Sequence, residues 1–395
     1  MFSSRTPADF TPNRIAEALH VVRAGGQRVI DLTESNPTRA GFDYPSDLLH
    51  LLADPRGLAY RPAALGALDA RIAVAEEYAR RGVPVAPERI ALTASTSEAY
   101  GFLFKLLAGP GDDVLVPRPS YPLFDHLARL DLVDAQPYDL DLDAGWRIDF
   151  DSLEQALTPR TRAVLIVSPN NPTGSFVKAD ELGRLARLCA ERGVAIIADE
   201  VFADFELTPG SGAGAASVLE QRDVLAFSLG GLSKSVGLPQ AKLAWIATAG
   251  PDGLVTRALE RLELVCDTYL SVSTPVQVAA ADLLTRGASV RGQIARRVSS
   301  NYRHLLARSS SVPACRVLPS EGGWSGVLQV PSLQSEEALV IDLLKKDNVL
   351  VHPGYFFDFR RESYLVVSLL VAEEAFAAGL DRILSHFDHG AALND

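Results

Sequence analysis

Cysteine, methionine and histidine are scarce in this chain of 395 residues. It contains three cysteines, one methionine and seven histidines. Cys189, Cys266 and Cys315 share no C-x-x-C spacing, so neither a disulfide framework nor a zinc cluster is expected. Because the histidines are scattered as well, we predict that the protein has no metal site.

Long apolar runs and an excess of positive charge are also absent. No stretch is long and apolar enough to span a bilayer, and the first residues, MFSSRTPADFTPNR, lack the apolar segment of a signal peptide. The net charge is -11, with acidic and basic residues interspersed, which argues against a nucleic-acid-binding surface. We therefore expect a cytoplasmic protein that binds neither membranes nor nucleic acids.

What the chain does have is enough apolar residues, 47% of the total, for a large core and two domains. From about residue 89, short apolar runs alternate with amphipathic stretches such as 97–108 and 179–192, which is typical of an α/β sheet covered by helices. The runs are apolar throughout, so we expect strands buried on both faces of a mostly parallel sheet. They are RIALTA (89–94), DVLVP (113–117), AVLIVS (163–168), VAIIAD (194–199), VLAFSL (224–229) and LAWIAT (243–248).

After residue 250 the pattern changes to that of a smaller α+β domain. Long helices are expected from about 252 to 272 and onward to about 307. Short strands near 314–317, 325–330 and 364–370 and a helix near 335–346 should follow. We predict a large domain at 45–275 and a small domain formed by 1–44 and 276–395.

Several reactive side chains follow the expected strands. Ligands of an open α/β sheet bind beyond the carboxyl ends of its strands, and the side chains there are Ser95, Thr96, Ser97, Tyr121, Asn171, Asp199 and Lys234. The three hydroxyls open a helix, whose N-terminus favours a phosphate group. A lysine that can lose its proton forms Schiff bases with carbonyl compounds, and an acid can pair with a pyridinium nitrogen. Together these side chains suit pyridoxal 5'-phosphate.

Four longer segments extend this pattern. SPNNPTG (168–174), ADEVF (198–202), SKSVGLPQAKLAW (233–245) and LAYRPAALGALDAR (58–71) resemble, in order and spacing, those of the class I/II aminotransferases of fold type I, the superfamily of aspartate aminotransferase. The resemblance covers almost the whole chain. It implies an α/β fold whose large domain holds a mostly parallel sheet of the seven-stranded type, covered by helices.

The resemblance also implies a role for individual residues. Lys234 would hold the cofactor covalently, Asp199 would pair with its ring nitrogen, and Asn171 would bind its ring hydroxyl. Tyr121 would stack on the ring, and the hydroxyls of residues 95–97 would hold the phosphate. Tyr60 would reach the phosphate of a neighbouring subunit, which implies a homodimer with shared active sites.

Departures from the family pattern bear on the cofactor and the substrate. At the position of the family's usual phosphate-binding arginine, this chain has Lys242, which keeps the charge without the bidentate geometry. Where the family usually has a phosphate-binding serine, this chain has Gly231, which leaves Ser228 as a possible substitute. Where the family has a tyrosine near the ring hydroxyl, this chain has Phe202. The position at which the family commonly has the arginine that binds the substrate α-carboxylate is occupied by Val366.

Another cation could take the place of the missing arginine. Arg39 is the first candidate, because the matching segment of the family crosses the mouth of the active site, with Arg360 and Arg361 behind it. Asn36 and Tyr269 are further candidate pocket residues.

The expected activity is that of an aminotransferase of class EC 2.6.1. It would move an amino group from an amino acid to a 2-oxo acid by a ping-pong mechanism, with Lys234 as the general base. Two alternatives remain open. One is another pyridoxal phosphate reaction on the same fold, by a lyase, decarboxylase or oxidase, which the loss of the arginine at Val366 makes more plausible. The other is a non-catalytic module that binds the cofactor.

Overall fold

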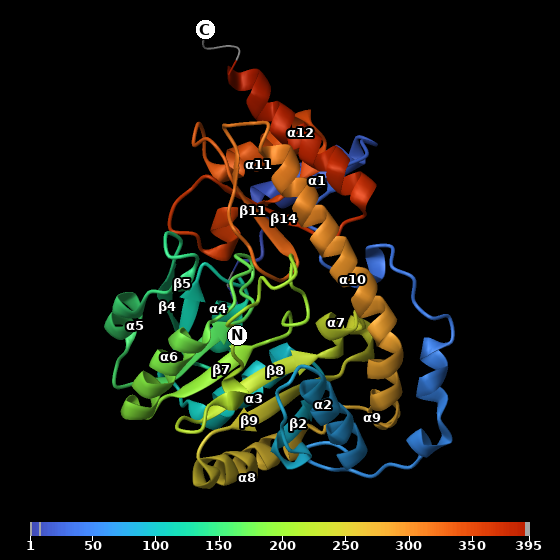
Figure 1. Cartoon of the computed structure of the whole chain (residues 1–395), viewed down its shortest axis with the longest axis vertical. Coiled ribbons are helices and arrows are strands. Elements are labelled where there is room, and N and C mark those ends of the chain that lie inside the picture. The colour runs from blue at the N-terminus through green and yellow to red at the C-terminus, as the bar shows by residue number, and fades with distance from the viewer. Residues whose placement is uncertain (1, 8, 392–395) are drawn as a thin grey trace.

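The computed structural model describes residues 2–7 and 9–391, and its largest element is an eight-stranded sheet (Figure 1). In spatial order its strands are β2 (Ile90–Thr93), β9 (Ala244–Ala249), β8 (Ala226–Gly231), β7 (Ala195–Asp199), β6 (Thr161–Val167), β3 (Asp113–Arg118), β4 (Asp134–Asp141) and β5 (Arg147–Ile148). The strands from β8 through β4 pair in parallel, whereas β9 and β5 pair antiparallel with their neighbours. The predicted α/β class with a mostly parallel sheet is confirmed.

The six apolar runs of the sequence all form strands, but the sequence did not reveal β4 and β5. The strand β4 has the sequence DAQPYDLD, and most of its side chains are exposed or half-buried. It lies next to the edge of the sheet, where the two-residue strand β5 pairs with it. A polar strand of this kind gives no continuous apolar signal. With the short edge strand β5, the sheet has eight strands, one more than the seven-stranded type that the resemblance implied.

Helices cover both faces of this sheet. The helices α3 (Thr96–Leu107), α4 (Phe124–Leu130) and α8 (Asp252–Tyr269) share one apolar cluster with it. The helices α5 (Phe150–Ala156) and α6 (Ala179–Arg192) pack on the other face, where α2 (Leu68–Arg80) and α9 (Thr274–Val278) contribute to a further cluster. Side chains of β7 alternate between the two faces, with Ile197 in one cluster and Ile196 in the other. Burial on both faces explains why these strands are apolar throughout.

A smaller antiparallel sheet lies above the large one in Figure 1. Its order is β10 (Arg316–Val317), β11 (Ser325–Gln329), β14 (Tyr364–Ser368) and β13 (His352–Pro353). The parallel pair β1 (Ile30–Asp31) and β12 (Val349–Leu350) forms a separate two-stranded sheet beside it. The helices α1 (Arg14–Ala24), α11 (Glu336–Lys346) and α12 (Glu373–Ala391) belong to the same part of the molecule. This arrangement confirms that a smaller α+β part exists. The helix α8, which also follows residue 250, packs on the large sheet instead, and α1 from the N-terminal segment joins the small part.

The 30-residue helix α10 (Ala280–Ser309) connects the two parts (Figure 1). Near its start, Leu283 and Leu284 pack into a cluster of the large sheet, whereas Val290, Ile294 and the apolar residues after them pack into the core of the small one. One helix thus belongs to both cores, and the domain boundaries at 44/45 and 275/276 stay a prediction.

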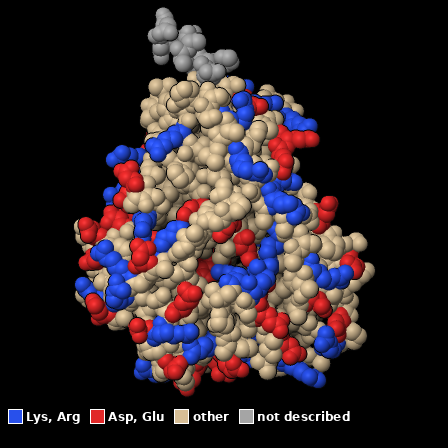
Figure 2. Space-filling view, viewed as in Figure 1, with Lys and Arg blue, Asp and Glu red and all other residues tan. Residues whose placement is uncertain are grey.

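The surface carries charges of both signs. Basic and acidic side chains are interspersed over the face shown in Figure 2. None of the helices that the structure describes has the length and apolar character needed to cross a membrane.

Candidate active site

The residues at the carboxyl ends of the parallel strands gather at one edge of the large sheet. Asp199 ends β7, and Lys234 lies in the short helix α7 (Leu232–Ser235), which directly follows β8. The neighbouring strands β6 and β3 lead to Asn171 and Tyr121. Parallel strands bring these sequence-distant side chains to the same edge.

Asp199 is held by two hydrogen bonds on the face of the sheet that α3 covers. The hydroxyl of Tyr100 donates to its Oδ2 at 3.1 Å, and the backbone N–H of Val201 donates to its Oδ1 at 3.1 Å. Burial raises the pKa of Asp199 to about 6, although both hydrogen bonds and the charge of Lys234 favour the ionised form. A positive group placed opposite this carboxylate would restore its charge.

Tyr100 was not found from the sequence. It lies in α3 four residues after Thr96, and its buried hydroxyl reaches the end of β7. Its spacing of one helical turn from the hydroxyl cluster indicates that it lies on the same side of α3 as that cluster. Only the fold, however, shows that its hydroxyl reaches Asp199 on β7.

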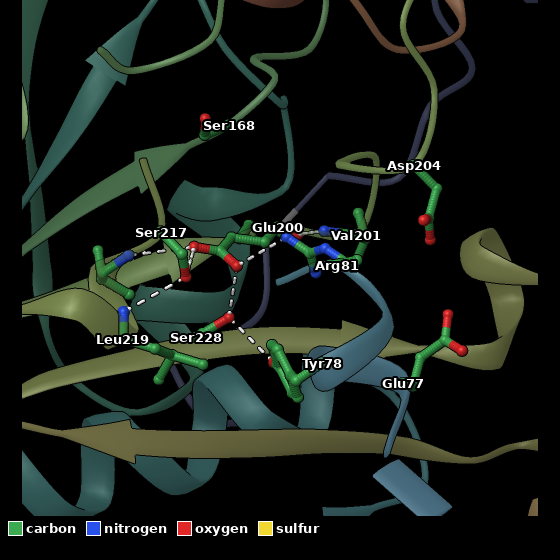
Figure 3. A network of polar contacts seen from close by, with 12 residues as sticks. Glu77, Tyr78, Arg81, Ser168, Glu200, Val201, Asp204, Ser217, Leu219 and Ser228 are labelled. Atoms are coloured by element: carbon green, nitrogen blue, oxygen red, sulfur yellow. Dashed lines mark hydrogen bonds and ion pairs between the residues drawn. The ribbon is translucent and has the colours of Figure 1, made fainter. Parts of the chain in front are cut away.

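The side chain of Glu200, the next residue, points to the opposite face of the sheet. Figure 3 shows its carboxylate beside Ser217, Ser228 and Arg81. Its carboxylate accepts hydrogen bonds from Ser217 Oγ at 2.8 Å and from Ser228 Oγ at 2.9 Å, and it pairs with Arg81 at 3.2 Å. Only one of the two adjacent acids therefore reaches the site.

This network corrects the proposal for Ser228. Ser228 is fully buried in the middle of β8, and its Oγ also shares a hydrogen bond of 3.0 Å with the hydroxyl of Tyr78. It lies on the same face as Glu200 (Figure 3), whereas Asp199 contacts Tyr100 of α3 on the other face. The period of two along a strand sends these side chains to the far face, so Ser228 is not available to a ligand at the strand ends.

The amine of Lys234 lies against two aromatic rings. Its Nζ is 4.7 Å from the ring centroid of Trp324 and 5.3 Å from that of Phe202. Burial lowers the pKa of this amine to about 8, and the charge of Asp199 opposes the change. A lysine with a depressed pKa beside an acid with a raised pKa can act as a nucleophile and as a base near neutral pH.

Trp324 was also missed from the sequence. It directly precedes β11 of the small sheet. The two glycines before it predict a turn, but nothing nearby in the sequence indicates a role in the site. Only the packing of the two sheets reveals that its ring reaches Lys234.

Asn171 lies where the two sheets meet. Its Oδ1 accepts a hydrogen bond from Ser325 Oγ of β11 at 3.2 Å. Its amide N–H groups have no acceptor among the described residues and can donate to a ligand. The adjacent Asn170 is buried and fixes the turn, because its Nδ2 donates to the carbonyl of Pro119 at 3.0 Å. This bond ties the turn to the segment that carries Tyr121, whose ring is 38% exposed and packs edge-on against Phe124.

The hydroxyl cluster forms the N-terminus of α3. Ser95 is the N-cap residue, and its side chain accepts a hydrogen bond from the backbone N–H of Glu98 at 3.1 Å. Thr96 and Ser97 open the helix, and Ser97 is exposed. The free N–H groups of such a helix end favour an anion.

Lys242, Tyr60 and Tyr269 are placed on the surface. Lys242 is exposed and has a left-handed backbone conformation, with φ 53°, just before β9. Tyr60 is 72% exposed and lines a hollow together with Leu270, the residue after Tyr269. The ring of Tyr269 packs against Phe102 with centroids 5.0 Å apart. The structure gives neither tyrosine a contact with Lys234 or Asp199 in the described part of the chain.

The candidate substrate residues Asn36 and Arg39 already have partners. Asn36 caps the short helix η1 (Pro37–Arg39) and accepts hydrogen bonds from the backbone N–H and the hydroxyl of Thr38. Arg39 is exposed and pairs with Glu34 at 3.2 Å. This segment adjoins β14, because Ser368 Oγ donates to the carbonyl of Glu34 at 2.6 Å.

Arg360 is engaged elsewhere. It pairs with Asp139, which also accepts from Arg118 at 3.0 Å. Val366 is buried in an apolar cluster that includes Trp146 and Phe359. The position where the family pattern has an arginine is thus part of a hydrophobic core.

The residues at this edge of the sheet fit pyridoxal phosphate. Asp199 is a carboxylate whose charge is not balanced by an ion pair within the described residues, Asn171 has free amide donors, and the start of α3 suits a phosphate. Among the described residues, no group of three or more His, Cys, Asp and Glu is arranged to hold a metal ion.

Comparisons with known proteins agree with this arrangement. The family of aminotransferases of class I and II matches residues 29–383. The chain is 26% identical over 376 residues to alanine aminotransferase of Mycobacterium tuberculosis, covering 92% of this chain and 86% of that protein. It is 31% identical over 245 residues to an S-alkyl-thiohydroximate lyase of Arabidopsis thaliana, covering 60% of this chain and 52% of the lyase.

Among solved structures, alanine aminotransferase from Pyrococcus furiosus has the same fold. The TM-score is 0.89 at 22% identity, covering 98% of this chain and 100% of that one. The match to the family extends over most of the sequence and includes the strands, the lysine helix and the small sheet. The chain therefore belongs to the class I and II aminotransferases.

Proposed function

We propose that this enzyme binds pyridoxal phosphate at the carboxyl edge of its large sheet and transfers the amino group of an amino acid to a 2-oxo acid in two half-reactions. The observation that carries the proposal is the placement of Lys234 and Asp199 at the same edge, with the pKa of the amine lowered and that of the acid raised. The family to which the chain belongs uses this cofactor.

Each side chain of the site then has a role in holding the cofactor. Asp199 faces the ring nitrogen, and Tyr100 keeps its carboxylate in place. The Asn171 amide donates to the ring hydroxyl, and Ser325 fixes the direction of that amide. Tyr121 stacks on the ring.

The phosphate is held by a second group of residues. Thr96, Ser97 and the N-terminus of α3 bind it through hydroxyls and backbone N–H groups. Ser95 contributes chiefly as the helix cap, because its side chain accepts from Glu98. Lys242 supplies a positive charge. Ser228 does not belong to this group, because its hydroxyl donates a hydrogen bond to Glu200.

The chemistry at the substrate depends on the amine of Lys234. When bound, pyridoxal phosphate supplies an electron sink for the charge that develops at the substrate Cα. The neutral amine of Lys234 removes the Cα proton, and its pKa of about 8 leaves a useful neutral fraction at physiological pH. The ionised Asp199 keeps the ring nitrogen protonated, which the electron sink requires.

A substrate carboxylate must be bound without an arginine at position 366. Arg39 remains our candidate, because its segment is joined to β14 through Glu34 and Ser368. Binding would require Arg39 to exchange Glu34 for the substrate. Asn36 would support this segment, since its side chain caps η1.

We also propose a homodimer in which Tyr60 reaches the phosphate of the other subunit. Leu58, Tyr60 and Leu68, which are close in sequence, are all exposed large apolar residues. Exposed apolar side chains concentrated in one segment are what a subunit interface would cover. Tyr269 lies near the same surface, so we place it at the interface and not beside Lys234.

A lyase reaction on the same site is the second candidate. Two observations favour it: Val366 replaces the carboxylate-binding arginine, and one relative is an S-alkyl-thiohydroximate lyase. A purely binding role is set aside because the chain belongs to an enzyme family and retains Lys234.

The test is a half-reaction with the purified holoenzyme. A panel of amino acids is added without any 2-oxo acid, and the absorbance of the bound cofactor is followed. Stoichiometric conversion of the cofactor to its amine form, with one equivalent of 2-oxo acid, supports transamination and identifies the donor. Many turnovers with the cofactor spectrum retained would instead identify a lyase, decarboxylase or oxidase. Repeating the panel with Arg39→Gln should raise the KM of the donor if Arg39 binds its carboxylate.

A further inference from the structure

The amine of Lys234 lies in a pocket of aromatic rings. Its Nζ is 4.7 Å from the Trp324 ring centroid and 5.3 Å from the Phe202 ring centroid. The two rings meet edge to face, with centroids 5.2 Å apart and planes at 65°. Both distances are within the range in which an ammonium ion is attracted by the face of a ring.

The Trp324 ring is held rigidly. Only 4% of its surface is exposed, and Phe205 packs against it with centroids 5.2 Å apart. The backbone on both sides is fixed, because Gly323 N–H donates to the carbonyl of Phe205 at 2.8 Å and Leu369 N–H donates to the carbonyl of Trp324 at 2.7 Å. The ring therefore presents a fixed surface to Lys234.

Few other groups stabilise the charged amine. Within residues 2–7 and 9–391, the Lys234 amine has no hydrogen bond and no ion pair at 4.0 Å or less. The one charged group that acts on it is Asp199 on β7. Tyr100, which contacts Asp199 from α3, and Tyr121 both have pKa values raised by burial and are neutral at physiological pH. Because the amine has lost much of its hydration, attraction to the rings has more effect than at an exposed surface.

We propose that Trp324 and Phe202 form an aromatic clamp that holds the protonated amine of Lys234 whenever that amine is not joined to the cofactor. Trp324 is the main positioning residue, since its ring is closer and an indole attracts a cation more strongly than a phenyl ring. The catalytic consequence rests on the proposed function. The contact itself does not.

The clamp depends on charge, which gives it a mechanistic role. It attracts the ammonium form of Lys234, so it opposes the effect of burial on the acidity of the amine. Once the amine loses its proton, the attraction disappears and the side chain is free to approach the substrate Cα. The rings therefore position the protonated lysine and release the neutral base.

The test measures the ionisation of Lys234 in the full-length protein without cofactor. The pH dependence of its acylation by acetic anhydride is followed by mass spectrometry of the Lys234 peptide. Trp324→Leu removes the aromatic face, and Trp324→Phe keeps a weaker one. Trp146→Leu is the matched control, because Trp146 is also a buried tryptophan whose indole N–H has no partner among the described residues, and it packs with Phe359 instead of Lys234.

The expected result is a graded fall in the pKa of Lys234. Trp324→Leu should lower it by about half a pH unit to one and a half units, and Trp324→Phe by less. Trp146→Leu should leave it unchanged. If Trp324→Leu does not fold, as judged by circular dichroism, the Trp324→Phe variant and Phe202→Leu carry the test, and both must lower the pKa.

An unchanged pKa in folded Trp324 variants would overturn the clamp, and so would an equal fall in Trp146→Leu. In the holoenzyme, the rate of the amino-acid half-reaction should reach its plateau at a correspondingly lower pH in Trp324→Phe. The first measurement needs no turnover, so the clamp can stand even if the enzyme transaminates none of the amino acids in the panel.

Discussion

Replacing Asp199 with asparagine should make the cofactor-free protein more stable while impairing the enzyme. Asparagine keeps the shape of the side chain. Its Oδ1 can still accept the hydrogen bond from the backbone N–H of Val201, and its amide N–H can donate to the hydroxyl oxygen of Tyr100, which reverses the present bond from Tyr100. The substitution therefore removes the charge and keeps both contacts. The variant therefore separates the cost of burying a carboxylate at this position from the benefit of having one opposite the cofactor.

The size of the effect follows from the acidity of Asp199. Its pKa is 3.8 in an ordinary environment and about 6 in the folded protein, and this interval corresponds to about 3 kcal/mol. Because the folded protein binds the proton more tightly, this contribution to stability is complete below pH 3.8 and is lost as the pH rises through about 6. The amide that replaces the carboxyl in Asp199→Asn does not titrate. The variant should therefore gain about 2 to 3 kcal/mol relative to wild type between pH 4 and pH 7.

The assay is urea unfolding of both cofactor-free proteins at a fixed protein concentration across this pH range. The difference in unfolding free energy should rise with pH and level off above pH 7. In the holoenzymes the wild type should have the higher unfolding free energy, since the carboxylate of Asp199 can pair with the ring nitrogen and an amide cannot. Turnover should fall at least about a hundredfold in the variant. A difference that stays constant from pH 4 to pH 7 would refute the burial argument.

Three further substitutions test other parts of the site. Phe202→Tyr should place a hydroxyl near the ring hydroxyl of the cofactor and lower the spectroscopic pKa of the bound cofactor, as read by an absorbance titration; an unmoved titration would mean that position 202 does not reach the ring. Ser228→Ala should lower the unfolding free energy by about 1 to 3 kcal/mol, because Glu200 loses a buried hydrogen bond, yet leave cofactor affinity intact. Weaker cofactor binding would return Ser228 to the phosphate site. Arg360→Ala should change stability by less than about 1 kcal/mol and leave the KM for the amino acid unaltered, because Asp139 still pairs with Arg118; a large rise in KM would show that Arg360 binds the substrate.

The elements of this fold could be predicted well from the sequence where local pattern is strong. The apolar runs before Thr93, Asp199 and Ser228 are strands because their side chains are buried on both faces, and burial of that kind leaves a continuous apolar signal. The strand β4 was missed because its polar residues lie near the edge of the sheet. Asp199 and Lys234 could be named because strand ends of a parallel sheet share one edge.

Tertiary structure decided which side chains meet, and the sequence by itself could not. Ser228 was assigned to the phosphate, but the alternation of side chains along β8 directs it to Glu200. Arg360 was a candidate for the substrate, but the packing of the small sheet on the edge of the large one brings it to Asp139. Trp324 and Tyr100 contact Lys234 and Asp199 from elements about a hundred residues away in sequence. Periodicity specifies strands and helices locally, whereas such contacts arise only when distant elements pack together.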